Sequence, residues 1–326
     1  MGLPTDQTVE ALQNDLHSWA GAQVSPTYYD AMIGEARQLY ADLVGVSVDR
    51  VAIGSQAAAQ FAMVAASVPD GGNVLCVDGD FSSVVFPFLQ HARRGVRVTH
   101  FPLSELADNI TDDTSFVAFS LVQSATGRIA ESDRILQAAR AHGARVVCDT
   151  TQAAGWLPVD ASPFDATVCH TYKWLCAPRG VSFLTVSDDF LAELIPVEAN
   201  WYAGDDPWES CYGPNMHLAS DARRFDVSPA WQAWVGALPA LRMFAGTDME
   251  EVRAYDARLG DSFSEGMGLE SRGQAILTWP DQDGADLRRL TEAGITASGR
   301  AGRARVAFHL WNDDEDVALA LRALGR

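Results

Sequence analysis

The sequence has little positive charge, and this limits its possible partners. Lysine and arginine together number 24 against 43 acidic residues, so the formal net charge is −19 and the pI is near 4.6. A surface of this kind repels the phosphate backbone of nucleic acids and anionic lipid. We therefore expect no nucleic-acid partner.

Membrane and disulfide signals are also absent. Residues 1–20 contain no basic start followed by an apolar signal region, and no uncharged apolar run approaches the length of a membrane span. The cysteines are odd in number and lack C-x-x-C spacing, which favours reduced core thiols: Cys76, Cys148, Cys169, Cys176 and Cys211. The sequence therefore predicts a cytoplasmic protein with no membrane segment and no bound metal.

What the chain does contain is an alternation of short apolar strands and amphipathic helices up to about residue 186. This order predicts an α/β fold with a mostly parallel sheet between helices, whose ligands bind beyond the carboxyl ends of the strands. We place a large α/β domain at 21–225 and a small α+β domain at 226–326, with residues 1–20 packing with the small one. No G-x-G-x-x-G or P-loop pattern follows a strand, so nucleotide binding is disfavoured.

Individual elements are expected from periodicity and capping residues. Strands are expected at 51–53, 74–78, 96–101, 116–120, 144–148 and 166–169, and helices at 7–19, 28–44, 56–67, 82–93 and 132–143. After a Trp-rich loop at 191–213 we expect a long helical stretch at 231–263, a helix at 287–293, a strand at 305–310 and a last helix capped by Asn312.

The strongest chemical signal comes directly after the strands expected at 144–148 and 166–169. Asp149 ends one strand and Gln152 comes three residues later, while the next strand leads into His170, Tyr172 and Lys173. Pyridoxal phosphate needs this layout, because its aldehyde forms a Schiff base with a lysine amine and its ring nitrogen stays protonated opposite a buried carboxylate. Lys173 and Asp149 fit these two catalytic roles.

Each of these residues also has an ordinary structural interpretation. An aspartate at a strand end often only caps a helix or forms a turn, and a single lysine in a loop is usually solvated. Together they are harder to explain in that way, because Lys173 lies between Tyr172 and Trp174 in an otherwise apolar run. Burial there would depress the pKa of the lysine amine and keep it nucleophilic.

The same motifs carry a family resemblance. D-T-T-Q-A-A-G at 149–155 and H-T-Y-K-W-L at 170–175, followed by Pro178 and Gly180, resemble the class V aminotransferase family, which belongs to the fold-type I pyridoxal-phosphate enzymes. The likeness runs from about Val51 to the C-terminus. It implies pyridoxal 5′-phosphate as the cofactor, an amino acid as the substrate, and a homodimer with shared active sites.

The resemblance assigns cofactor contacts to further residues. Ser55 and Gln56 stand where the family has its phosphate loop, although a strand-to-helix turn of this kind is often a simple cap. His170 and Tyr172 occupy the other phosphate-contacting positions. Phe81 stands where a ring stacks on the pyridine, with core packing as the alternative, and this choice of Phe over His is typical of kynureninase-like and isopenicillin-epimerase-like members.

Two serines are assigned in the same way. Ser124 aligns with a position near the phenolic oxygen of the cofactor that is often Asn in the family, so Gln152 is an alternative for that contact. Ser228 lies in a stretch, 223–229, that reaches across the dimer interface to the partner's phosphate in the family. The alternative for Ser228 is a cap of the next helix, because Ser followed by Pro is a common helix start.

Arg305 is the expected substrate-binding residue. It begins a strictly alternating strand, in which residues such as Val306 and Leu310 pack inward while Arg305 faces the other way. The motif R-V-A-F-H-L-W-N resembles the closing motif of the family, whose arginine grips the substrate carboxylate at two points. Arg300 and Arg303 are nearby competitors for this role.

The reaction itself is left open by the sequence. Removal of the α proton by the lysine is the common start of transamination, β-elimination and epimerisation. No cysteine lies between Gly294 and His309, where the family places one for persulfide chemistry, so a desulfurase is disfavoured. We expect a transaminase first, with a carbon–sulfur lyase, an epimerase or a non-catalytic pyridoxal-phosphate-binding regulatory protein as alternatives. The chain begins at a Gly-Leu-Pro turn that relatives usually precede with a further segment, so the resemblance implies either a missing piece or a more open pocket.

Overall fold

The computed structural model describes residues 2–326, and the chain forms two compact units. The first unit contains residues up to 121, 130–155 and 159–247, and the second contains 122–129, 156–158 and 248–326. Within residues 2–326, no helix combines the length and the apolar composition that crossing a bilayer requires.

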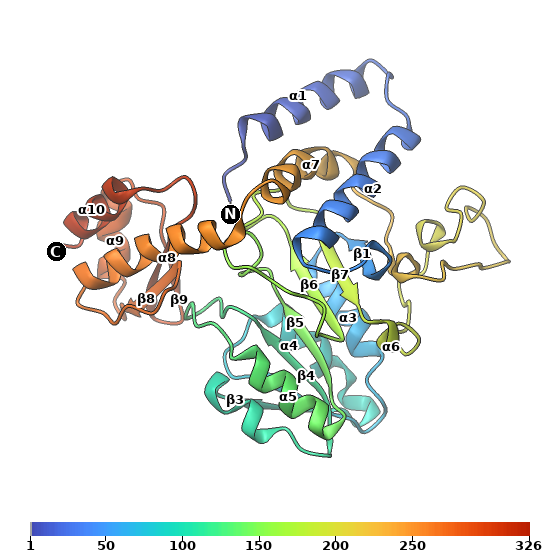
Figure 1. The fold of residues 1–326 in the computed structure, drawn as a ribbon, viewed down its shortest axis with the longest axis horizontal. Helices are drawn as coiled ribbons and strands as arrows, with labels where there is room; N and C mark the ends of the chain where they lie inside the picture. The colour runs from blue at the N-terminus through green and yellow to red at the C-terminus, as the bar shows by residue number, and fades with distance from the viewer. Residues whose placement is uncertain (1) are drawn as a thin grey trace. The chain divides into compact units, whose positions relative to one another are not determined.

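A seven-stranded sheet forms the centre of the first unit (Figure 1). Its strands lie in the order β1-β7-β6-β5-β4-β2-β3, with bounds β1 Val51–Gly54, β2 Asn73–Val77, β3 Arg97–Phe101, β4 Thr114–Ser120, β5 Arg145–Asp149, β6 Ala166–His170 and β7 Ser182–Val186. Only β7 runs against the others in this sheet, since it pairs antiparallel with both β1 and β6 while the remaining pairs are parallel. The predicted mostly parallel sheet is confirmed.

Helices cover both faces of the sheet, and nearly every residue of its inner strands is therefore buried. On one face, α3 (Ala57–Ala66) and α4 (Ser82–Leu89) share an apolar core with alternate strand residues such as Val74 and Val147. In Figure 1 both helices lie behind the strands, and α5 (Ser132–His142) lies in front.

The opposite face is packed through aromatic rings near the β1 edge. Helices α2 (Pro26–Leu43) and α7 (Trp231–Ala245) contact each other, and Phe183 of β7 packs against both. The Phe183 ring stacks on Tyr40 with centroids 4.1 Å apart and meets Trp234 edge-on at 5.4 Å. Full burial of a side chain of this size stabilises a fold by about 1.5–3 kcal/mol. Helix α1 (Asp6–Ala20), the first helix of the structure, packs on α7.

A buried ion pair ties α2 to the β1 edge of the sheet. Both guanidinium nitrogens of Arg37 donate to the carboxylate of Asp226, at 2.6 and 3.0 Å, and the side chains are 8% and 2% exposed. The same two side chains bind the strand backbone, since Arg37 donates to the Val51 carbonyl and Asp226 accepts from the Ile53 N–H at 2.8 Å. Every charge in this pair is therefore compensated.

The second unit is a small α+β structure, as expected. Its three strands pair antiparallel in the order β8-β10-β9, and three helices complete it: β8 Ile276–Pro280, β9 Ser298–Arg300, β10 Arg303–Ala307, α8 Met249–Gly266, α9 Ala285–Glu292 and α10 Asp314–Ala323. Phe263 of α8 anchors its core, with ring centroids 5.5 Å from Trp279 and 5.7 Å from Phe308.

The long helical stretch expected at 231–263 is divided between two helices. Helix α7 ends at Ala245, before Gly246, and α8 begins at Met249. Asp248 caps α8 by accepting from the backbone N–H groups of Glu250 and Glu251. A glycine followed by an aspartate cap ends one helix and starts the next, and here that local signal prevails over the continuous apolar periodicity.

Two expected boundaries near the C-terminus are wrong. The last strand spans Arg303–Ala307 because its pairing with β8 ends at Ala307, so Leu310 lies beyond it and is 36% exposed instead of packed inward. The last helix is capped by Asp313, whose carboxylate accepts from the N–H of Asp316 while the Asp316 side chain accepts from Asp313 in return. This reciprocal capping box leaves Asn312 one residue outside the helix start.

Loss of the Arg37–Asp226 ion pair should destabilise the first unit strongly. In Asp226→Asn the buried guanidinium loses its charge partner, so we expect the free energy of unfolding to fall by about 3–5 kcal/mol in urea titrations. The control is Glu35→Gln, which breaks an ion pair with Arg242 whose side chains are 43% and 56% exposed, and which should cost under about 1 kcal/mol. Equal losses in the two variants would contradict this account.

A second prediction concerns Asp256 of α8, which is fully buried and makes no hydrogen bond to residues that the structure describes. Its neighbour His309 has Nδ1 at 3.9 Å, but that nitrogen accepts from the Leu310 N–H at 2.7 Å and so carries no proton for the carboxylate. Burial therefore raises the pKa of Asp256 to about 8.

Because the folded state favours the protonated acid, the stability should decrease as the pH rises from about 4 to about 8. Asp256→Asn removes this titration. We expect the variant to be more stable than the wild type at pH 7 by an amount on the order of 2 kcal/mol, with the difference shrinking towards pH 4. Chemical denaturation of both proteins at pH 4 and pH 7 measures the difference in unfolding free energy between them. A stability advantage of the variant that is smaller at pH 7 than at pH 4 would contradict the prediction.

Candidate active site

Lys173 lies in the turn that joins β6 to β7, at the carboxyl edge of the sheet. Backbone hydrogen bonds hold this turn from two sides, since the Thr171 N–H donates to the Val181 carbonyl at 3.1 Å and the Gly2 N–H donates to the Tyr172 carbonyl at 3.0 Å. Lys173 is also the sole lysine of the sequence, because 23 of its 24 basic residues are arginine. Any link between a lysine amine and a cofactor aldehyde must therefore form here.

Two glycines allow other segments to touch the main chain of this turn. Gly155 has a φ of +112°, and a Cβ on it would lie 2.4 Å from the carbonyl carbon of Trp174. A Cβ on Gly2 would lie 2.2 Å from the carbonyl oxygen of Lys173. Backbone thus packs directly on backbone, which fixes the main chain that carries the amine.

The aromatic ring of Phe81 lies close to the lysine amine. The distance from Nζ to the Phe81 ring centroid is 5.2 Å, and the ring is 42% exposed, as a ring that stacks on a bound ligand would be. Asp80 holds this loop in place, because its carboxylate accepts from the Phe81 N–H at 2.6 Å and from the Ser120 N–H at 2.8 Å. Asp80 thereby joins the end of β2 to the end of β4.

Asp149 lies one strand away, at the end of β5 and in register with Ser120. It is 5% exposed, and its carboxylate accepts from the Thr151 N–H at 2.9 Å. Burial raises the pKa of Asp149, and the positive charge of Lys173 opposes this shift. The structure thus brings the predicted acid and the predicted amine within electrostatic range of each other.

Gln152 is oriented by a contact that the sequence motifs do not reveal. The indole N–H of Trp174 donates to the Gln152 amide oxygen at 3.0 Å, and both side chains are buried. Since the oxygen end of the amide faces the indole, the nitrogen end is the one that can donate to an oxygen of a ligand. Trp174 is therefore a site residue that its place beside Lys173 could have suggested.

The expected phosphate contacts converge on the edge where β1 and β6 flank β7. Gly54 and His170 both pair with Ser182, so Ser55 and Gln56 at the start of α3 lie near the end of β6. A helix N-terminus at this point supplies backbone N–H donors for an anion.

His170 is neutral at this edge. Burial, followed by the charges of Arg179 and Lys173, lowers the pKa of His170 to about 4. Its Nε2 is buried and makes no hydrogen bond to the residues that the structure describes. An unsatisfied buried nitrogen of this kind suits a polar ligand, so the residues present fit pyridoxal phosphate.

Arg179 is a second residue that the motif analysis passes over. It precedes β7 and lies on the face of Tyr172, with Cζ 4.7 Å from the ring centroid. The Tyr172 ring in turn meets the His170 ring edge-on at 4.5 Å. The signal in the sequence was the P-R-G turn directly before the returning strand.

The remaining expected residues belong to other segments of the chain. Ser228 is exposed in the first unit, where the N–H of the preceding Val227 donates to the Ile53 carbonyl of β1 at 3.4 Å. Ser124 and Arg305 both belong to the second unit. The Nε of Arg305 is buried without a hydrogen bond to described residues, and burial together with Arg300 lowers the pKa of Arg305 to about 10. Such a guanidinium suits an anionic ligand.

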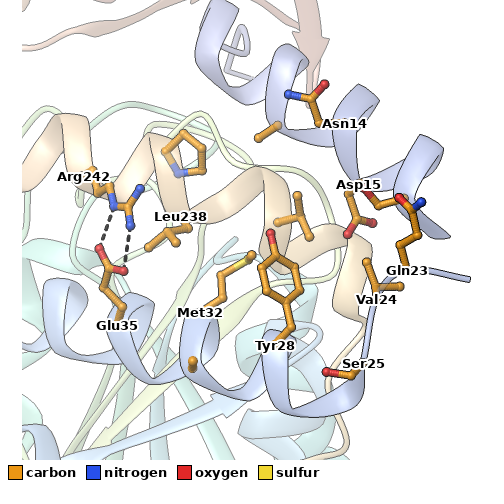
Figure 2. Close-up of a pocket in the computed structure, with 15 residues that line it drawn as sticks. Asn14, Asp15, Gln23, Val24, Ser25, Tyr28, Met32, Glu35, Leu238 and Arg242 are labelled. Carbon is orange, nitrogen blue, oxygen red and sulfur yellow. Dashed lines mark hydrogen bonds and ion pairs between the residues drawn. The ribbon is translucent and has the colours of Figure 1, made fainter. Parts of the chain in front are cut away.

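A cavity of about 640 Å³ lies apart from these residues, among α1, α2 and α7 (Figure 2). Figure 2 shows Tyr28 and Met32 of α2 facing Asp15 of α1, beside the Glu35–Arg242 ion pair. None of the residues expected to bind the cofactor lines this cavity. We therefore place the candidate active site at the strand ends.

Comparison with known proteins identifies the family of the chain. The aminotransferase class-V family model matches residues 5–283. An uncharacterised aminotransferase of Bacillus subtilis, YcbU, is 24% identical over 98% of this chain and 94% of its own length. An isopenicillin N epimerase of Streptomyces clavuligerus is 31% identical over 187 residues, and a probable cysteine desulfurase of Aeropyrum pernix is 33% identical over 178. The matches with the epimerase and the desulfurase cover 52% and 50% of this chain but only 47% and 43% of those proteins.

Among solved structures, a cystine C–S lyase in complex with its product cysteine persulfide superposes with a TM-score of 0.88 at 20% identity, over 98% of this chain and 94% of that one. The fold and the family match define a pyridoxal-phosphate-dependent enzyme of fold-type I. The chain belongs to the aminotransferase class-V family, as its motifs suggested. Its cofactor is pyridoxal 5′-phosphate.

Asp80→Asn tests how the Phe81 loop is held. In the variant, one acceptor oxygen is replaced by an NH₂ group, so the N–H of Phe81 or of Ser120 loses its acceptor. We expect the unfolding free energy to fall by about 1–3 kcal/mol and pyridoxal phosphate to bind more weakly in absorbance titrations. Asp78→Asn is the matched control, because Asp78 is exposed and its side chain makes no hydrogen bond within residues 2–326. Equal effects in the two variants would show that Asp80 does not hold the loop.

Proposed function

We propose that this enzyme breaks the Cα–H bond of an amino acid, with the amine of Lys173 as both the attachment point of the cofactor and the base. The observation that supports the proposal is that the only lysine lies 5.2 Å from the exposed ring of Phe81 and acts electrostatically on the buried carboxylate of Asp149. Bound pyridoxal phosphate supplies an electron sink that stabilises negative charge developing at the α carbon.

Asp149 has the task of keeping a proton on the ring nitrogen of the cofactor. A buried carboxylate that accepts one backbone hydrogen bond is a strong partner for a positive ring nitrogen, because little solvent screens the pair. The raised pKa of Asp149 reflects the same burial, which a bound cation would offset. Asparagine could accept a hydrogen bond but could not balance the charge.

Phe81 and Gln152 position the group on which this chemistry depends. We propose that the Phe81 ring covers one face of the pyridine and excludes water from it, since its loop is fixed by Asp80. The donating end of Gln152, set by Trp174, then serves the phenolic oxygen. The amine of Lys173 would be the base that takes the α proton of the substrate.

The relatives differ in the step after proton removal. The protein matched over 98% of this chain is described as an aminotransferase, and this supports transamination. The epimerase and desulfurase relatives support epimerisation or carbon–sulfur cleavage at least as well. Persulfide chemistry has no cysteine between residues 294 and 309 to carry it, so carbon–sulfur cleavage here would be a β-elimination. Elimination is therefore our second candidate.

We further propose a cytoplasmic homodimer in which Ser228 lies beside the cofactor phosphate of the partner. The exposure of Ser228 next to the β1 edge supports this role. No disulfide links the five cysteines within residues 2–326, and four of them are buried, as suits a reducing compartment. In Arg305, a buried donor without a hydrogen bond among the described residues supports binding of the substrate carboxylate.

Borohydride reduction of the holoenzyme tests the attachment. Because the chain has one lysine, the adduct should appear on a single tryptic peptide that contains residue 173, and Lys173→Ala should bind no cofactor covalently. Mass spectrometry of the reduced protein reads this directly. Wild-type protein that gains no adduct mass, or gains it on another peptide, would remove the basis of the proposal.

The reaction is resolved by mixing the holoenzyme with single amino acids and following its visible spectrum. Conversion to pyridoxamine phosphate marks transamination, release of pyruvate and ammonia marks elimination, and loss of optical activity without either product marks epimerisation. Exchange of the α hydrogen with deuterated water should accompany all three outcomes. Lack of exchange with every amino acid tried would count against Lys173 as a base.

A further inference from the structure

The segment before β7 occupies a defined place between the two expected phosphate contacts. Ser182, the first residue of β7, pairs with Gly54 at the end of β1 and with His170 at the end of β6. The residues just before Ser182 therefore continue between Ser55, which follows β1, and Thr171, which follows β6. The hydrogen bond from Thr171 to Val181 confirms that the two segments remain side by side beyond the sheet.

Arg179 brings a positive charge to this place. Its guanidinium lies 4.7 Å from the centroid of the Tyr172 ring, which holds it at the edge. Its charge already acts on His170, whose pKa it helps to lower. The side chain is exposed and has no carboxylate partner among the residues that the structure describes, whereas Arg37, Arg145 and Arg242 each bind one.

This absence of a partner matters in a chain with 43 acidic residues and 24 basic ones. A phosphate ester carries nearly two negative charges and is bound most strongly by charge-assisted hydrogen bonds, for which arginine is well suited. Ser55 and Gln56 offer only dipoles, and His170 is neutral because burial lowers its pKa. The amine of Lys173 is committed to the aldehyde. Arg179 is the remaining cation in this group.

We propose that Arg179, held on the ring of Tyr172, is the cation that binds the 5′-phosphate of the cofactor. The inference rests on the lysine-linked site of the proposed function but concerns affinity for the cofactor, not turnover. This role of Arg179 also gives a reason for the aromatic residue directly before the lysine. The ring of Tyr172 holds the guanidinium of Arg179 in place by a cation–π contact.

The experiment compares two ligands that differ only in the phosphate. Apo-protein is titrated with pyridoxal 5′-phosphate and with pyridoxal, and binding is followed by the absorbance of the lysine adduct. Arg179→Gln should weaken binding of the phosphate ester by about 10- to 100-fold and that of pyridoxal by less than about 3-fold. Arg93→Gln is the control, because Arg93 is exposed, has no ion pair among the described residues, and loses the same charge. The melting temperature of both apo-variants should match the wild type.

Three results would overturn the proposal. Equal weakening of both ligands in Arg179→Gln would mean that the residue shapes the lysine turn instead of binding phosphate. Unchanged affinity for the phosphate ester would remove Arg179 from the phosphate site. Unchanged affinity combined with a raised KM for an amino acid would assign it to the substrate carboxylate.

Glutamine is used because a lysine at 179 would add a second amine. Since binding is the readout, absence of turnover would refute only the proposed reaction.

Discussion

The turn between β6 and β7 is the constraint on which the rest of the active site depends. It carries the only lysine of the chain, and backbone contacts hold it on several sides, through Gly2, Gly155 and Val181. Because the main chain cannot shift, the distance from the lysine amine to Phe81 and its electrostatic coupling to Asp149 are set by the sheet. A looser turn would lose both relationships at once.

Electrostatics at this edge depend on burial more than on the number of charges. The protein has a large excess of acid, yet the groups around the lysine are a buried carboxylate, a neutral histidine and an arginine without a carboxylate partner among the described residues. Each state has a physical cause: desolvation raises the pKa of Asp149 and lowers that of His170. The site is thereby prepared for a ligand that is positive at its ring nitrogen and negative at its phosphate.

Much of the fold could be predicted because its strands are short, apolar and separated by helices with clear caps. The errors arose where a local signal competed with periodicity. The apolar pattern of 231–263 continues across a glycine and an aspartate cap that end one helix and begin another. The strand that starts near Arg305 stops at Ala307 because its partner strand stops there, and no property of residues 308–310 announces that end.

The sequence by itself predicted the cofactor but not the reaction. A single lysine in an aromatic run, an aspartate at a strand end and the family motifs around them indicated pyridoxal phosphate. Only the tertiary structure decided which neighbours act on these groups. Trp174 orients Gln152, and Asp80 binds Ser120, because strand order and register place residues that are distant in sequence side by side. Strand order arises from long-range packing, which local sequence patterns do not encode.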